Sequence, residues 1–294
     1  MLPRLSIVTP SFNQGRFLDQ TSQSVLGQRD QVHEYFVYDG GSTDDSVDVI
    51  RRHADRIDYW TSAKDKGQSD AIARGFARAS GDFIAWLNSD DLYLPGALDR
   101  IRAALEAHPD WDVVGGDHVR IDAHSRILSV HRFAGESRAA ALRGVFHPCQ
   151  PTVFFRRSLY EKVGGLKQDL HMVMDTELFF RMLDAGAVWG HVHAPIAAFR
   201  LHESSKTMDR SDKYAPEYQF LDRTYPQYHA KSAWHYLGRS AARVMQFLSG
   251  RELAARRDAK RWRGRTIADV FGPPVLTEPH EPTDKSESST QRVR

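Results

Sequence analysis

Cysteine is almost absent from the chain. The single Cys149 among 294 residues excludes an intramolecular disulfide framework and a cysteine-rich zinc site, and it fits a reducing compartment. No uninterrupted apolar stretch approaches the roughly 18–20 residues that a membrane-spanning helix needs. Residues 1–4 lead directly into a strand-like run without a charged region and an apolar region before it. We therefore expect no secretory signal and a cytoplasmic location.

Glycine-rich phosphate-binding motifs are also missing. No G-x-G-x-x-G follows the first predicted strand, which argues against a dinucleotide site. No G-x-x-x-x-G-K-[ST] is present, which argues against a P-loop. Any phosphate group would therefore be held mainly by a metal ion and basic side chains.

The net charge of +2 hides an uneven distribution. Residues 230–265 hold ten lysines and arginines against two acids, a local charge of +8 that leaves about −6 for the rest. A basic segment on an acidic body suggests an anionic surface as a partner. The composition is otherwise ordinary for a globular protein, with 41% hydrophobic and 27% charged residues. The length allows one large α/β domain or two small ones.

Strand and helix patterns alternate through the first 116 residues. This alternation is typical of βαβ units and predicts an α/β fold, a Rossmann-related single domain with a mostly parallel central sheet. The predicted strands cover residues 5–9, 35–38, 57–60, 83–87 and 113–116. The predicted helices cover residues 17–26, a segment capped by Ser42 or Asp44 and ending near Ala54, residues 68–79 and a segment after Pro95.

Beyond residue 116 the pattern changes. Residues 117–133 are typical of short antiparallel strands, and no linker separates them from the residues that follow. Further predicted elements are strands at 152–155 and 197–202 and helices at 159–163 and 175–183. The predicted organisation is a domain over 1–210 with halves 1–116 and 117–210, a helical, basic extension over 211–272 and a disordered tail over 273–294.

The predicted extension combines an apolar stripe with a basic face on one helix. The stripe comprises Trp234, Leu237, Ala241, Val244 and Leu248, and the face comprises Lys231, His235, Arg239 and Arg243. Such a helix can lie on anionic lipid, which predicts peripheral contact with the inner face of the cell membrane. An ordinary packing helix with a solvated basic face is the alternative. Nucleic-acid binding is not expected, because aromatic residues are not interleaved with the later basic ones.

The most informative segment is residues 83–91 (FIAWLNSDD), where a buried strand runs into two adjacent carboxylates, Asp90 and Asp91. In an open α/β sheet, ligands bind just outside the carboxyl ends of the strands. Two oxygen ligands there suit Mg²⁺ or Mn²⁺ and a substrate phosphate. A solvated acidic turn is the alternative.

Two other predicted strands end in small polar groups on the same rim. Thr9 and Pro10 end the first strand, and Asp39 ends the second. A carboxylate in this position can accept from a nucleotide base or a ribose hydroxyl. Asp39 could instead do no more than cap its own turn.

Seven segments in order resemble family 2 glycosyltransferases of the GT-A fold, over about residues 4–210. Those of the nucleotide-sugar half are 5–13 (LSIVTPSFN), 39–45 (DGGSTDD), 65–71 (DKGQSDA) and 87–91 (LNSDD). Those of the acceptor half and beyond are 147–155 (HPCQPTVFF), 174–182 (MDTELFFRM) and 199–207 (FRLHESSKT).

The resemblance implies an enzyme that moves a sugar from a nucleoside-diphosphate sugar to a glycan or lipid-linked acceptor, as in bacterial polysaccharide or cell-envelope synthesis. It implies a divalent cation, Mn²⁺ or Mg²⁺, with Asp91 as the direct metal ligand and His202 near the metal or diphosphate. Asp175 would be the general base. The implied substrate-binding residues are Thr9, Pro10, Asn13, Asp39, Ser42, Lys66, Gln68, Asp70, Asp90 and Gln150. Taken singly, Asp175 could cap its helix, His202 could be structural and Gln150 could be a turn residue.

Two positions depart from the family's pattern. Asn88 stands where an aspartate is common, so a site with three carboxylates is not available. Met174 stands where a glutamate is common, so the acidic pair keeps only its second member, Asp175.

The implied chemistry is a single displacement. A cation stabilises the charge that grows on the diphosphate, and a carboxylate accepts the proton of the attacking hydroxyl, so the anomeric carbon inverts. A double displacement would need a second carboxylate, and Glu177, two helical positions from Asp175, faces elsewhere. Two alternatives are a nucleotide-sugar-binding subunit without transferase activity and a nucleotidyltransferase. The second needs a glycine-rich basic loop after the first strand, and residues 11–16 (SFNQGR) match it poorly.

Overall fold

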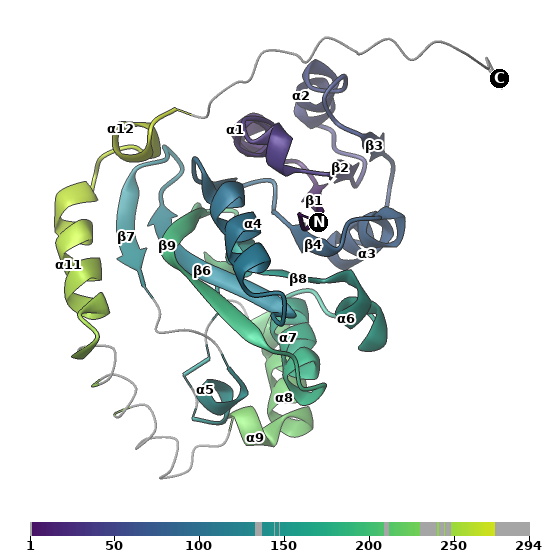
Figure 1. Cartoon of the computed structure of the whole chain (residues 1–294). Coiled ribbons are helices and arrows are strands. Elements are labelled where there is room, and N and C mark those ends of the chain that lie inside the picture. The colour runs from purple at the N-terminus through teal and green to yellow at the C-terminus, as the bar shows by residue number, and fades with distance from the viewer. Residues whose placement is uncertain are drawn as a thin grey trace.

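The computed structural model describes residues 2–132, 137–143, 145–146, 148–208, 212–229, 240, 244 and 248–273. Strands and helices alternate through its first half, as the sequence predicts (Figure 1). The elements of this half are β1 (Leu5–Ser11), α1 (Gly15–Leu26), β2 (Glu34–Asp39), α2 (Ser46–Arg52), β3 (Tyr59–Ser62), α3 (Gln68–Arg78), β4 (Phe83–Trp86), β5 (Leu92–Tyr93) and α4 (Ala97–Ala107).

The second half continues the same sheet. Its elements are β6 (Val113–Ile121), β7 (Ile127–His131), α5 (Arg138–Leu142), β8 (Phe154–Arg156), α6 (Arg157–Lys162), α7 (Met174–Asp184), β9 (Trp189–Arg200), α8 (Ala215–Thr224), α9 (Pro226–His229), α11 (Arg251–Trp262) and α12 (Ile267–Phe271). Short 3-10 turns cover Arg29–Gln31 (η1), Gln150–Thr152 (η2), Lys206–Met208 (η3) and Asp212–Tyr214 (η4).

The nine-stranded sheet has the order β3-β2-β1-β4-β8-β6-β9-β5, and β7 pairs with the free length of β6. Strands β3, β2, β1 and β4 are parallel, β8 runs antiparallel between β4 and β6, and β6 pairs in parallel with β9. Most of the paired length is therefore parallel, which confirms the predicted fold class. The predicted antiparallel strands after residue 116 are the β6–β7 hairpin.

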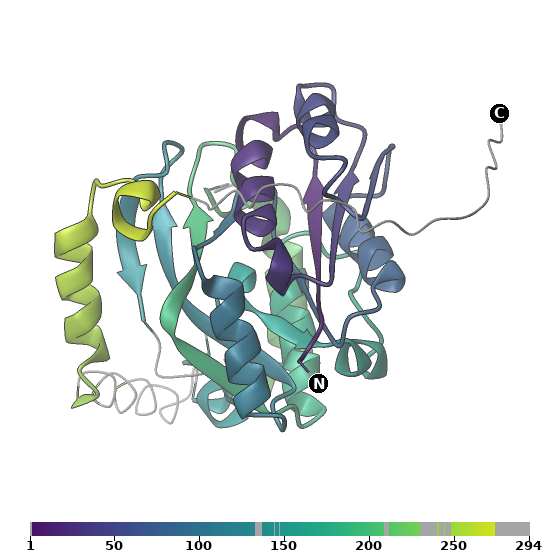
Figure 2. The ribbon, with the colours of Figure 1, turned by 45° about the horizontal axis from the view of Figure 1, so that its top comes forward.

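Both faces of the sheet are covered, so the central strands β1 and β4 are buried along their whole length and are mostly apolar (Figures 1 and 2). Along β1, Leu5 and Ile7 belong to one core cluster with residues of α1, α2 and α4. Val8 points to the other face and joins a cluster with residues of α3 and α7. Pro10 can lie within this central strand because the pairing of β1 with β4 has already ended at Val8.

Some predicted boundaries are wrong. β9 begins at Trp189, well before the predicted Ala197, because its first half (WGHVHA) is interrupted by glycine and histidines, gives no continuous apolar run and is defined by its pairing with β6. The two-residue strand β5 is too short to leave a pattern. The N-cap of α2 is Asp45, so neither Ser42 nor Asp44 occupies the predicted capping position, although the Asp44 carboxylate accepts from the Ser46 backbone N–H at 3.0 Å.

The described part of residues 211–272 packs against the sheet domain. Leu221, Tyr225 and Tyr228 of α8 and α9 belong to the same core cluster as α7. α11 and α12 lie beside β7, where the Gly264 and Ile267 N–H groups donate to the backbone of the β6–β7 hairpin (Figure 2). Within the described residues, no helix is long and apolar enough to cross a bilayer. The predicted apolar stripe and basic face lie outside the described residues, with the exception of Val244 and Leu248. The predicted tail beyond Pro273 also lies outside them.

Candidate active site

A cavity of about 820 Å³ opens at the carboxyl ends of the parallel strands. It receives side chains or backbone from both halves of the domain and from the segment after β9. Residues at the strand ends form one side of its wall: Pro10 and Ser11 at the end of β1, Gly40 and Gly41 after β2, and Asn88–Asp91 after β4. The other side comprises Gln68 at the start of α3, Gln150, Asp175 and Ser204–Thr207.

The acidic pair after β4 is asymmetric. Asp91 is 1% exposed, and its carboxylate accepts from the Arg200 backbone N–H at 2.9 Å and from Asn88 Nδ2 at 3.3 Å. Burial, together with the adjacent charge of Asp90, raises the pKa of Asp91 well above its usual range. The strand end thus holds a buried carboxylate whose charge is poorly compensated by the protein.

Asp90 is the more accessible member. His202 Nε2 lies 3.0 Å from Asp90 Oδ2, and the His202 ring packs on Phe17 with 4.7 Å between ring centroids. Arg200 Nε donates to the Asp90 carbonyl at 2.8 Å, and this hydrogen bond fixes the backbone of the turn. β9 therefore brings Arg200 and His202 to the acidic turn, although more than 100 residues separate them in the chain.

These groups fit a divalent cation. Among the described residues, no three histidine, cysteine or acidic side chains already lie close enough to form a complete metal site. Two carboxylates and an imidazole nevertheless suit Mn²⁺ or Mg²⁺, with the remaining positions left to phosphate oxygens and water. A cation here would also relieve the repulsion that raises the pKa of Asp91.

Asn88 organises this turn, which explains its departure from the family's aspartate. Its Oδ1 accepts from Gln68 Nε2 at 2.6 Å, and its Nδ2 donates to Gln150 Oε1 at 3.1 Å as well as to Asp91. Gln150 Nε2 in turn donates to the Trp86 carbonyl at 2.7 Å. An aspartate at position 88 could not donate to either partner, so the amide is the residue this network requires.

Lys206 is a site residue that the sequence reasoning missed. Its ammonium donates to Gln68 Oε1 at 2.7 Å and to the His171 carbonyl at 3.2 Å. Burial lowers its pKa, and the charges of Glu217, Asp90 and Asp175 act in the opposite direction. Its only sequence signal was its place in the segment 199–207, which carries no charge pattern of its own.

Asp175 lines the same cavity from the start of α7. The N-cap of this helix is Val173, so the alternative reading of Asp175 as a helix cap is wrong. Its Oδ1 accepts from the Thr176 N–H at 2.6 Å, and the side chain is partly exposed. Burial raises the pKa of Asp175, although the Thr176 hydrogen bonds and the charge of Lys206 oppose the shift. Met174 instead points into the core, where it is 5% exposed.

Glu177 is unavailable for chemistry. It is fully buried and bound by Lys167 Nζ at 2.8 Å, Arg181 Nη2 at 2.7 Å and the Tyr225 hydroxyl at 2.8 Å. Although burial acts to raise its pKa, these hydrogen bonds and charges lower it. Glu177 is therefore a structural anion, as its position two residues from Asp175 predicts.

Glu217 of α8 holds the start of α7. Its carboxylate accepts from the backbone N–H groups of His171, Met172 and Val173 at 2.7–3.1 Å. Free N–H groups at a helix start favour an anion, and here the anion comes from a neighbouring helix. α8 thus fixes the helix that carries Asp175.

Several residues implied by the resemblance lie outside the cavity wall. Asp39 is 2% exposed, and its carboxylate accepts from the Gly41 and Ser42 N–H groups at 3.1 and 2.9 Å and from the Ser62 hydroxyl at 2.7 Å. These are the bonds of the turn-capping alternative, and the turn presents Gly40 and Gly41 to the cavity instead. Thr9 is buried and accepts from the Tyr35 hydroxyl at 3.1 Å.

The remaining residues of that set organise loops. Asn13 accepts from the Thr43 N–H at 2.9 Å and its own N–H donates to Ser42 Oγ at 2.8 Å, so the pair ties together the loops after β1 and β2. Asp70 accepts from the Lys66 N–H at 3.4 Å. The residues that do line the cavity are Pro10, Gln68, Asp90, Asp91, Gln150 and Asp175, and His202 contacts Asp90. Contact of any of them with substrate stays a prediction.

Comparison with known proteins decides the family. Residues 6–164, more than half of the chain, match the family model described as glycosyl transferase family 2. The chain belongs to glycosyltransferase family 2. An uncharacterized glycosyltransferase of Mycobacterium tuberculosis is 33% identical over 184 residues, which cover 61% of this chain and 68% of the relative. A glycosyltransferase of PGL/p-HBAD biosynthesis in Mycobacterium bovis is 26% identical over 67% of this chain and 77% of its own length.

Solved structures of glycosyltransferases share the GT-A fold. Staphylococcus aureus TarS 1–349 in complex with UDP-GlcNAc superposes with a TM-score of 0.63 at 14% identity, over 76% of this family 2 enzyme and 66% of that chain. The mannosyltransferase PcManGT from Pyrobaculum calidifontis, in complex with GDP-Man and Mn²⁺, has a TM-score of 0.56 at 18% identity, with coverage of 94% and 87%. The fold is thus confirmed, and family membership argues against both alternative functions raised from the sequence.

The contact of Glu217 with α7 gives a first prediction. Replacing Glu217 with alanine leaves three N–H groups at the start of α7 without their anion, so we expect a loss of about 1–2 kcal/mol of unfolding free energy. Urea denaturation measures it. Glu217→Gln, which keeps one acceptor oxygen, should lose less, and Gln219→Ala, at an exposed position of the same helix, should lose almost nothing. An unchanged urea midpoint for Glu217→Ala would contradict the capping role.

Proposed function

We propose that this family 2 enzyme is a metal-dependent, inverting glycosyltransferase that uses a nucleoside-diphosphate sugar. One observation carries the proposal. A poorly compensated acidic pair after β4 and a carboxylate with a raised pKa at the start of α7 line one cavity. The first suits a metal-bound diphosphate, and the second suits a general base.

Side chains of the cavity wall would stabilise the nucleoside diphosphate as it leaves the sugar. Asp90, Asp91 and His202 would hold the cation, which when bound supplies Lewis-acid stabilisation of the diphosphate. The Lys206 ammonium, held by Gln68 and the His171 carbonyl, provides a second positive charge in the same wall. Both act where negative charge develops in the transition state.

Asp175 would accept the proton of the acceptor hydroxyl as that oxygen attacks the anomeric carbon. Single displacement is favoured because the nearby carboxylate Glu177 is buried in ion pairs and cannot act as a nucleophile. One base and one leaving group then give inversion of the anomeric centre.

The donor class is supported by the solved neighbours, which are bound to UDP-GlcNAc or GDP-Man. Gly40, Gly41 and Pro10 present the rim on which the base and ribose would lie, with Thr9 and Asp39 supporting it from below. The acceptor would be a glycan or lipid-linked glycan of bacterial polysaccharide synthesis.

Peripheral contact with an anionic membrane is part of the proposal, and α11 supports it. Of its two acids, Asp258 is buried and bound by Arg132, and Glu252 forms an ion pair with Arg256 at 2.9 Å, which leaves an excess of basic charge on the exposed side. Its outward residues are basic or apolar, which suits an anionic surface. They are Leu253, Arg256, Arg257, Lys260 and Arg261.

Asp175→Asn tests the base. We expect the release of UDP or GDP from nucleotide sugars to fall at least about a hundredfold, because the amide cannot take a proton. Isothermal titration should show donor binding unchanged, and Asp110→Asn, at an exposed position, should keep full turnover. Near-normal turnover in Asp175→Asn would overturn the assignment.

The pH profile follows from the raised pKa of Asp175. The active form is the ionised carboxylate, so turnover should fall as pH drops through a pKa that is higher than that of an ordinary aspartate. Steady-state rates measured from about pH 4 to about pH 8 locate the pH at which turnover falls on the acid side. An acid limb at or below the ordinary aspartate pKa would contradict the role.

Metal dependence can be measured without turnover. Titration of UDP or GDP should show tight binding with Mn²⁺ and at least about tenfold weaker binding with EDTA, because the acidic pair then repels the diphosphate. Asp91→Ala and Asp90→Ala should each lose the Mn²⁺ effect, whereas Asp110→Ala should keep it. An equal affinity for the nucleoside diphosphate in Mn²⁺ and in EDTA would contradict metal dependence.

Membrane contact is tested by co-sedimentation with phosphatidylglycerol vesicles. Reversing two outward charges with Lys260→Glu and Arg261→Glu should weaken binding by at least about tenfold, since each basic residue near an anionic surface contributes about 1 kcal/mol. Lys162→Glu with Arg143→Glu is the matched control, exposed elsewhere on the chain. Equal losses in both double variants would indicate that only net charge matters.

A further inference from the structure

Two tyrosines near the candidate base, one of them in the cavity wall, have no role in the proposed chemistry. Tyr214 ends the short turn η4 and lines the cavity together with Asp175. Tyr218 lies in the first turns of α8 and is 52% exposed. Tyr214 is the N-cap of α8 and Tyr218 lies one turn further along the chain, so the two tyrosines are neighbours at the start of this helix.

The start of α8 is held beside the candidate base. Glu217, between the two tyrosines, accepts from three N–H groups at the start of α7, the helix on which Asp175 is the second residue. The charges of Asp175 and Glu217, after burial, raise the pKa of Tyr218, which reflects the same closeness. Lys206, which donates to the His171 carbonyl, lies next to both acids.

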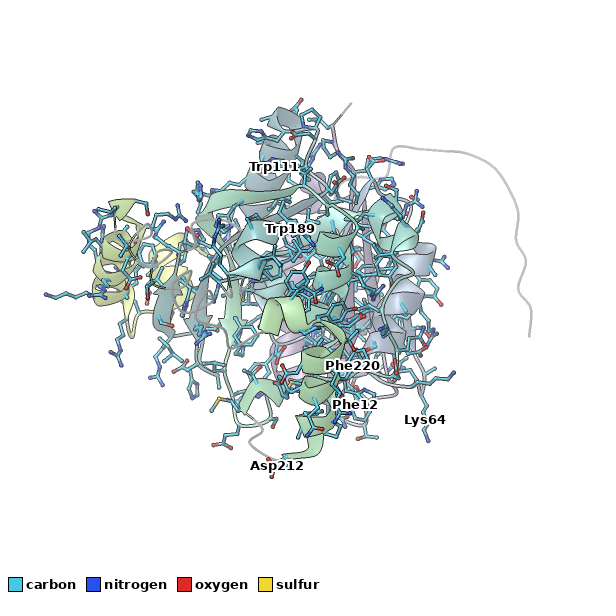
Figure 3. All side chains as sticks on the ribbon, turned by 90° about the horizontal axis from the view of Figure 1, so that it is seen from below. Phe12, Lys64, Trp111, Trp189, Asp212 and Phe220 are labelled. Carbon is cyan, nitrogen blue, oxygen red and sulfur yellow. The ribbon has the colours of Figure 1, made fainter. Side chains whose placement is uncertain are left out.

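The two rings are open to a ligand. Among the described residues, no aromatic ring packs on either tyrosine, and Tyr214 has only the Lys213 ammonium over its ring, 4.8 Å from the centroid. A half-exposed tyrosine offers a flat apolar face and a polar hydroxyl on one rigid side chain. Asp212, at the start of η4, and Phe12, on the rim after β1, lie in the same part of the molecule in Figure 3.

We propose that Tyr214 and Tyr218 form an acceptor subsite on which a sugar ring of a glycan acceptor stacks, with its attacking hydroxyl directed to Asp175. The inference rests on the proposed function and deepens it by assigning the acceptor class. A pyranose has apolar C–H faces and a polar edge, which match a tyrosine face beside charged groups. A lipid chain alone would need a continuous apolar surface, and Glu217, Lys206 and Lys213 interrupt one here.

Binding of simple glycosides tests the subsite without knowledge of the natural acceptor. The probes are methyl α-D-mannopyranoside and the methyl β-D-pyranosides of glucose, galactose and N-acetylglucosamine, observed by saturation-transfer NMR with Mn²⁺ and UDP or GDP. At least one probe should bind the unmodified enzyme. Tyr214→Ala and Tyr218→Ala should each raise its Kd at least about fivefold, the loss expected for one aromatic contact.

Two variants separate stacking from other effects. Tyr218→Phe keeps the ring and should stay within about twofold of the unmodified enzyme. Gln219→Ala, at the next exposed position of α8, should not change the Kd. Urea midpoints of all variants confirm that the fold is retained, and Tyr218, being half exposed, tolerates the truncation.

The outcomes distinguish a failure of the acceptor subsite from a failure of the proposed function. If no glycoside binds the unmodified enzyme, or if binding persists in the Tyr214→Ala/Tyr218→Ala double variant, the acceptor subsite is wrong. Release of nucleotide from the donor by the unmodified enzyme and by Gln219→Ala, measured on the same preparations, reports on the proposed function separately. Donor turnover without glycoside binding overturns only the subsite, whereas a complete lack of donor binding and turnover overturns the proposed function itself.

Discussion

The site depends on keeping two adjacent carboxylates together at the end of a buried strand. Asp91 has almost no contact with solvent, and Asp90 beside it adds to its electrostatic cost. The surrounding chain offsets part of that cost with the Arg200 N–H and the Asn88 amide. These contacts require β9 to run back along β6 to the acidic turn, and they require Gln68 and Gln150 to fix Asn88.

Asp175, the base that we propose, lies on a helix whose start is held by a residue of another helix. α7 lacks a capping side chain at its N-cap, and Glu217 of α8 supplies the anion. Tyr225 of the same region binds the buried Glu177 one half-turn along α7. The segment after the sheet domain therefore holds the helix that carries the proposed base, and the same segment offers the tyrosines that we assign to the acceptor.

The sequence predicts those elements of the fold whose residue pattern follows from their own burial. Strands β1, β2 and β4 are buried and rich in apolar residues, which the sequence shows, whereas the two-residue β5 and the interrupted first half of β9 (WGHVHA) are defined by their pairing partners. In the site, the resemblance located Asp90, Asp91, Asp175 and His202, because short motifs preserve strand ends and helix starts. It could not reveal that Asp39 is taken up by its own turn, since that follows from backbone N–H directions. Lys206 and Glu217 were missed because their importance arises from partners far away in the chain.

The central claim is that the acidic turn after β4 anchors a cation and a diphosphate facing Asp175. A crystal of the protein grown with Mn²⁺ and a nucleoside diphosphate, measured at a wavelength where manganese scatters anomalously, tests it directly. The account predicts an anomalous peak beside Asp90, Asp91 and His202, with the diphosphate between that peak and Lys206. A peak elsewhere, or a nucleotide in the second cavity lined by Gln28, Pro95 and Thr266, would contradict it.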